Sequence, residues 1–181
     1  MQNLLGLHTN YVILLMTYGT AWMVKRYGDF FEKFGIDDKA LLAHFNEWKA
    51  QSNDDSVTNY IWYLFHVLLG ETRKQVTSQP DYFRNVHEIY LMMLEFRVGV
   101  EGQKDNSLVQ AIIKNRIRLW QTELPYSFQL QAISLNCCDF CESINGQVFT
   151  AEEVLHHTHF ATEKCTKEGG CSCGYMPVGE L

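Results

Sequence analysis

The sequence predicts a mainly α-helical protein: a bundle of four or five helices, then a small C-terminal module made of a β-hairpin and a short helix. Three observations predict this fold class. Apolar residues recur at helical spacing between polar turns over residues 1–125, and the pattern changes to alternation after Pro125. All six cysteines lie beyond residue 136. We therefore expect a helical domain at 1–125 and a cysteine-rich module at 126–181 packed on it.

The first predicted helix lies in an uncharged segment. Residues 1–24 contain no Asp, Glu, Lys or Arg, and residues 11–16 are strongly apolar. The segment lacks the basic start of a signal peptide. Polar residues interrupt it and leave an apolar core of about 14 residues, which is shorter than the ~20 needed to span a bilayer. We expect a buried helix, and a membrane anchor over residues 4–24 is the alternative.

Caps and breakers bound the helices that follow. Asp37 opens the next helix, and Ser56 is a plausible N-cap for another, with Gly70 as its C-terminal stop. Pro80 suits the first turn of a further helix, and Ser107 leads the last. The connections between these helices are short, which is typical of a bundle.

The module after Pro125 carries strand and turn signals. Residues 127–132 alternate polar with apolar, and Asn145-Gly146 followed by an apolar pair at 148–149 indicates a tight turn and a return strand. Thr150 and Glu153 form a capping-box pattern, which predicts a short helix.

The cysteines have the spacing of metal ligands. A C-x-x-C pair is followed about two dozen residues later by a second tight group, so two pairs of thiolates can surround one tetrahedral ion. We expect one structural Zn²⁺ in this module. The candidate ligands are Cys138, Cys141, Cys165, Cys171 and Cys173.

Four ligands suffice for a tetrahedral ion, and five cysteines are available. The spacing favours the set Cys138, Cys141, Cys165 and Cys173. Cys171 competes for the fourth place, while Cys137 is expected to be a bystander. Any of the histidines His156, His157 and His159 is an alternative ligand, although three histidines on a short helix are more typical of a solvated surface.

Charge and motif content restrict the function. The formal net charge of −6 argues against a general nucleic-acid binder. No Walker A loop, G-x-S-x-G or H-E-x-x-H motif occurs. Cysteines confined to one locus indicate a metal site in a reducing, cytoplasmic setting more than a disulfide framework. We expect a zinc-stabilised, non-enzymatic protein that binds a protein partner or itself. Alternatives are a zinc- or thiol-dependent enzyme using a free thiol of Cys137 or Cys171, and a membrane-associated protein.

The cysteine-rich tail also resembles a known family. Residues 138–178 contain the C-x-x-C pair, then Gly146 and a short apolar strand, then Cys171-Ser-Cys173 and a final Pro177-Val178. In these features the tail is similar to the C-terminal segment of phage minor head (head-morphogenesis) proteins. The resemblance implies metal binding by Cys138, Cys141, Cys171 and Cys173, and a phage- or prophage-related role. The sequence departs from that family at residues 168–170, which are Glu-Gly-Gly where the family usually has His-Pro.

Overall fold

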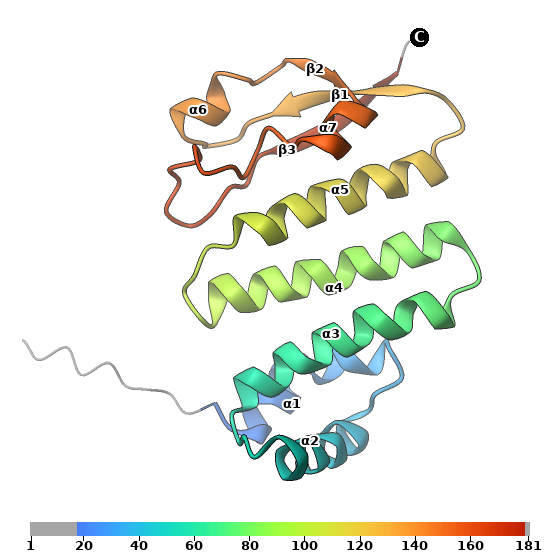
Figure 1. The fold of residues 1–181 in the computed structure, drawn as a ribbon, viewed down its shortest axis with the longest axis vertical. Helices are drawn as coiled ribbons and strands as arrows, with labels where there is room; N and C mark the ends of the chain where they lie inside the picture. The colour runs from blue at the N-terminus through green and yellow to red at the C-terminus, as the bar shows by residue number, and fades with distance from the viewer. Residues whose placement is uncertain (1–17, 180–181) are drawn as a thin grey trace, which may run out of the picture. The chain divides into compact units, whose positions relative to one another are not determined.

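The structure is a computed structural model that describes residues 18–179. Its internal contacts divide the chain into two compact units, Met1–Ile61 and Trp62–Leu181. The described residues are mainly helical and end in a small antiparallel sheet, which confirms that part of the predicted fold class (Figure 1). Residues 4–17 of the expected first helix lie outside the described part. Among the described helices, none combines the length and apolar character that a membrane span requires.

The first unit is built on α1 (Thr20–Glu32), α2 (Asp38–Ser52) and the start of α3 (Val57–Gln75). Buried side chains of α1 and α2, among them Phe31 and Leu41, lie in its core. Tyr60 at the start of α3 donates its hydroxyl hydrogen to the carbonyl of Leu41 at 3.1 Å. Asp37 accepts from the N–H of Ala40 at 2.7 Å, so the predicted start of α2 is confirmed.

In the second unit, α4 (Gln79–Gly99) and α5 (Asn106–Glu123) form an antiparallel helical hairpin (Figure 1). Ser78 caps α4, whose first turn contains Pro80 as predicted, and Asp105 caps α5. The buried Asn115 of α5 donates from its side-chain amide to the carbonyl of Phe83 at 2.7 Å. This polar bond across the apolar interface fixes the register of the two helices, because an unpaired amide there would be costly.

The helix α3 does not stop at Gly70 as the sequence suggested. It continues to Gln75, and space is open around the position that a Cβ would take at Gly70. A glycine inside a helix costs only about 1 kcal/mol relative to alanine, so a long helix tolerates it.

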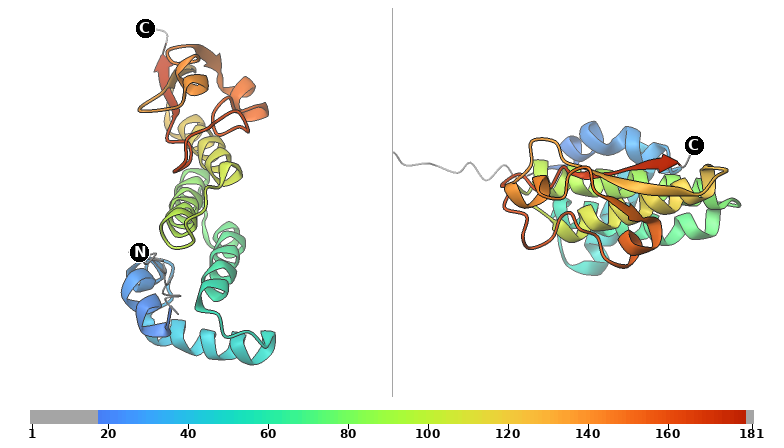
Figure 2. Two further views of the ribbon diagram at one scale, coloured as in Figure 1. Left: turned by 90° about the vertical axis from the view of Figure 1, so that its left-hand side faces the viewer. Right: turned by 90° about the horizontal axis from the view of Figure 1, so that it is seen from above.

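The C-terminal sheet has three strands in the order β2-β1-β3, all antiparallel. The strands are β1 (Phe128–Ile133), β2 (Val148–Thr150) and β3 (Gly174–Gly179). The pairing of β1 with β2 confirms the predicted strand and return strand, and β3 adds a third strand that the sequence pattern did not predict. Leu130 and Ala132 of β1 are fully buried on the face that packs against α5 and the short helix α7 (Ala151–His156) (Figure 2). The capping box of α7 is present as predicted.

The opposite face of the sheet has no charged side chain from its own strands, and the carboxylate of Glu153 lies at its edge, where it accepts from the hydroxyl of Thr150 at 2.8 Å. Gln131 of β1 pairs with Val148 of β2 on one side and with Met176 of β3 on the other. Val148 and Met176 are 48% and 49% exposed. None of the three strands contains an Asp, Glu, Lys or Arg. We call the outward-facing residues Gln129, Gln131, Val148, Thr150, Met176 and Val178 the outer sheet face.

Candidate metal centre

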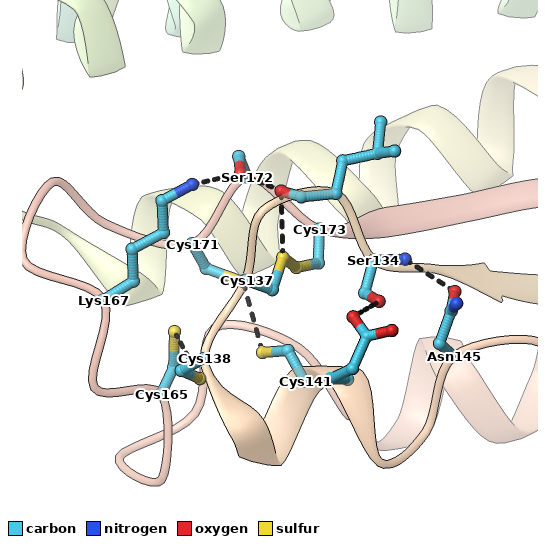
Figure 3. The surroundings of a disulfide bond; sticks show 12 residues. Ser134, Cys137, Cys138, Cys141, Asn145, Cys165, Lys167, Cys171, Ser172 and Cys173 are labelled. Carbon is cyan, nitrogen blue, oxygen red and sulfur yellow. Dashed lines mark hydrogen bonds between the residues drawn. A yellow bond between two sulfur atoms is a disulfide. The ribbon is translucent and has the colours of Figure 1, made fainter.

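The C-x-x-C pair lies on a one-turn helix in the connection between β1 and β2. This helix, α6 (Asp139–Glu142), begins directly after Cys138 and contains Cys141. Its end is held at the end of β1, because the hydroxyl of Ser134 donates to the carboxylate of Glu142 at 2.5 Å (Figure 3). The backbone N–H of Ser134 donates to the side-chain oxygen of Asn145 at 2.9 Å. The sheet thereby positions the first cysteine pair.

The second cysteine group lies on the loop before β3. The N–H of Cys165 donates to the carbonyl of Thr162 at 3.0 Å. Gly170 has a φ of +88° and donates its N–H to the carbonyl of Lys167 at 3.2 Å. A positive φ of this kind favours glycine, so Gly170 suits this turn. The turn directs the chain back toward α6 at Cys171.

The sulfur atoms of the two groups meet in pairs. The Sγ atoms of Cys138 and Cys165 are 3.9 Å apart, and those of Cys141 and Cys171 are 3.8 Å apart (Figure 3). Two sulfurs that bind one tetrahedral zinc at about 2.3 Å lie about 3.8 Å from each other. Two triplets of sulfur atoms, Cys138–Cys141–Cys165 and Cys141–Cys171–Cys173, each lie within 4.8 Å of one another. The five predicted cysteines therefore form a cluster that could hold a metal ion.

The thiols of the cluster differ in acidity. Hydrogen bonds from the backbone N–H groups of Cys141 and Thr166 lower the pKa of the Cys138 thiol to about 6. Burial, followed by the neighbouring thiol of Cys171, raises the pKa of the Cys141 thiol far above its ordinary value. Burial likewise raises the pKa of Cys165, against a backbone hydrogen bond from Lys167. A divalent cation would favour loss of the thiol protons of Cys141 and Cys165, because several thiolates so close together need a compensating positive charge.

The sixth cysteine takes part in a disulfide. Cys137 is bonded to Cys173, with their Cα atoms 6.8 Å apart (Figure 3). The four cysteines that remain free are Cys138, Cys141, Cys165 and Cys171. The sequence favoured Cys173 over Cys171 as the fourth ligand. The disulfide does not test this preference, because Cys173 also belongs to one of the two groups of neighbouring sulfurs.

The three histidines of the module differ in their surroundings. The ring of His159 stacks on Phe149 at a centroid distance of 4.1 Å, and its Nδ1 lies 3.1 Å from the hydroxyl of Tyr175. Burial raises the pKa of that hydroxyl to about 12, so Tyr175 stays neutral. His156 and His157 are exposed. In the part of the chain that the structure describes, no histidine belongs to a group of possible metal ligands.

The described residues define a mainly helical protein with a three-stranded C-terminal sheet and a thiol cluster that could hold a metal ion. Comparisons with protein-family models, with curated proteins and with solved structures find no match to this chain.

Proposed function

We propose that this chain is a non-enzymatic structural protein that binds other protein chains, and that one Zn²⁺ ion stabilises its C-terminal fold. The observation that carries the proposal is the approach of two pairs of free thiols to 3.8 and 3.9 Å, the spacing of adjacent ligands on a tetrahedral zinc ion. Thiolate ligands in this geometry favour zinc over hard cations such as Mg²⁺ or Ca²⁺.

The ligand set would be Cys138, Cys141, Cys165 and Cys171, the four cysteines outside the disulfide. Each pair joins one residue of the α6 segment to one residue of the loop before β3. The ion would therefore link two segments about 30 residues apart and constrain both relative to the sheet. Four thiolates leave no open coordination position, which is the pattern of structural zinc sites.

The outer sheet face supports the protein-binding part of the proposal. It exposes the apolar side chains of Val148 and Met176 in one cross-strand row and has no charged residue within its strands. Depletion of charge around exposed apolar side chains is typical of protein interfaces. The resemblance to phage minor head proteins suggests a role in an assembly and remains a proposal.

Metal content tests the structural part. Protein purified without added metal should contain about one zinc per chain by elemental analysis. A strong chelator should remove the ion and lower the midpoint of thermal unfolding, and added Zn²⁺ should restore it, because the assembled thiols of the folded state bind the ion more tightly than the unfolded chain does. A metal-free protein whose unfolding is unaffected by both chelator and zinc would contradict the proposal.

A thiol-dependent enzyme is the second candidate function, and the low pKa of the half-buried Cys138 thiol is the observation in its favour. A thiolate at neutral pH is nucleophilic. The two functions predict different reactivity of the Cys138 thiol in the zinc-loaded protein. Structural zinc should protect Cys138 from iodoacetamide, whereas a catalytic thiol should be alkylated at the same rate with and without the metal.

A further inference from the structure

A cavity of about 370 Å³ lies in the second unit between the α4–α5 hairpin and the chain around Cys171–Tyr175. This volume is within the range of small-molecule sites. Most of its walls are apolar, with contributions from Leu91 and Leu94 of α4 and from Ile112 and Ile113 of α5. None of the residues that line it is an Asp or Glu.

One cation borders this apolar cavity. The guanidinium of Arg116 lies 3.3 Å from Nε2 of His87, and its central carbon lies 5.3 Å from the ring centroid of Trp120. Among the described residues, no carboxylate forms an ion pair with Arg116. Two other arginines of this unit do have such partners, Arg84 with Glu123 at 2.6 Å and Arg97 with Glu101 at 2.5 Å. No ion pair among the described residues therefore neutralises the positive charge that Arg116 places at the border of the cavity.

His87 does not provide a negative charge to balance Arg116. A guanidinium has only donors, so Nε2 of His87 accepts from it and the ring proton resides on Nδ1. Burial, followed by the charge of Arg116, lowers the pKa of His87, so the ring is neutral at pH 7. Its Nδ1 is buried without a hydrogen-bond partner among the described residues. Among the residues that line the cavity, Arg116 is the one cationic side chain, and the charge of the nearby Glu88 partly opposes its effect on the pKa of His87.

We propose that this cavity binds a small carboxylate with an apolar chain, of the medium-chain fatty-acid class. A single guanidinium matches a single carboxylate, with which it forms two parallel N–H···O bonds. The alkyl chain would contact the apolar side chains of α4 and α5, whose burial by the ligand is favourable. This inference does not rest on the proposed function, although Cys171, a proposed zinc ligand, and Cys173 form part of one wall of the cavity.

Calorimetric titration of the full-length protein with octanoate tests the proposal, with octyltrimethylammonium and acetate as probes of the charge and the chain. Octanoate should bind one-to-one. The cationic analogue and acetate should each bind at least roughly tenfold more weakly, because each lacks one of the two interactions. Equal binding of octanoate and the cationic analogue, or no binding of octanoate, would overturn the proposal.

Two variants locate the site. Arg116→Gln should weaken octanoate binding by roughly tenfold or more, whereas Arg118→Gln, a change on the same helix outside this cavity, should leave it unchanged. Ile112→Trp should reduce binding by filling the cavity, with circular dichroism used to verify that each variant is folded. Octanoate binding that is unaffected by Arg116→Gln and Ile112→Trp would place the ligand elsewhere and refute the inference.

Discussion

Cys141 has a central place among the thiols of the candidate metal centre. It belongs to both groups of three neighbouring sulfurs, it is fully buried, and burial disfavours its thiolate. A buried group of this kind that faces several other thiols gains most from a cation that removes its proton. Cys137 differs, because it lies outside both groups and is bonded to Cys173.

Substitution of single cysteines tests these roles. Cys141→Ser should reduce the zinc content to well below one per chain, since a serine hydroxyl is a poor ligand for zinc beside thiolates. Cys137→Ser is the matched control and should retain the metal. Zinc per chain can be measured by atomic absorption.

The same measurement on Cys171→Ser and Cys173→Ser decides which of these two cysteines is the fourth ligand, and we expect only Cys171→Ser to lose zinc. Full metal content in Cys141→Ser would contradict the site.

The spacing of the cysteines was sufficient to predict which of them come together. A C-x-x-C pair and a later group can meet around one ion in many folds, so the five candidates follow from local pattern alone. The pairing of Cys137 with Cys173 could not be predicted in this way. Their sequence separation is 36 residues, and their approach depends on how β1 and β3 align in the sheet.

At the scale of secondary structure, local signals predicted most elements and missed one. Signals such as the caps Asp37 and Ser56 and the first-turn Pro80 act within a few residues of their helix, so they can be recognised in the sequence. The strand β3, with the sequence Gly-Tyr-Met-Pro-Val-Gly, contains a proline and one β-branched residue. It is stabilised by pairing along its whole length with β1, which is distant in the sequence, so local sequence patterns could not predict it.

The outer sheet face gives a prediction at the same scale. In an acidic chain of net charge −6, a face whose strands contain no charged residue is where two copies can meet with the least repulsion, so we expect self-association through it. Met176→Glu should weaken this association by roughly tenfold or more, because a two-fold interface contains the substitution twice. Sedimentation equilibrium measures the effect, with Leu42→Glu on the exposed side of α2 as control. A wild-type chain that stays monomeric at every concentration would exclude self-association through this face.

At the scale of the whole molecule, the cysteines are confined to one of the two compact units. All candidate ligands lie in Trp62–Leu181, whereas α1 and α2 belong to Met1–Ile61. Regions of a protein that do not share a cooperative core open independently. Zinc that links α6 to the loop before β3 should therefore stabilise its own surroundings and leave the first unit as it is.

Hydrogen exchange measured by mass spectrometry tests this expectation. Removal of the metal by a chelator should accelerate amide exchange in the segments at 134–150 and 160–179. The cysteine loop in each segment loses the shared ion, and the strand that follows each loop, β2 or β3, loses support. Exchange in α1 and α2 should not change, and this pair of helices is the internal control. Zinc added back should restore protection, whereas the Cys141→Ser variant should show the fast pattern with or without chelator. Faster exchange throughout the described chain would instead show that both units depend on the metal as one cooperative fold.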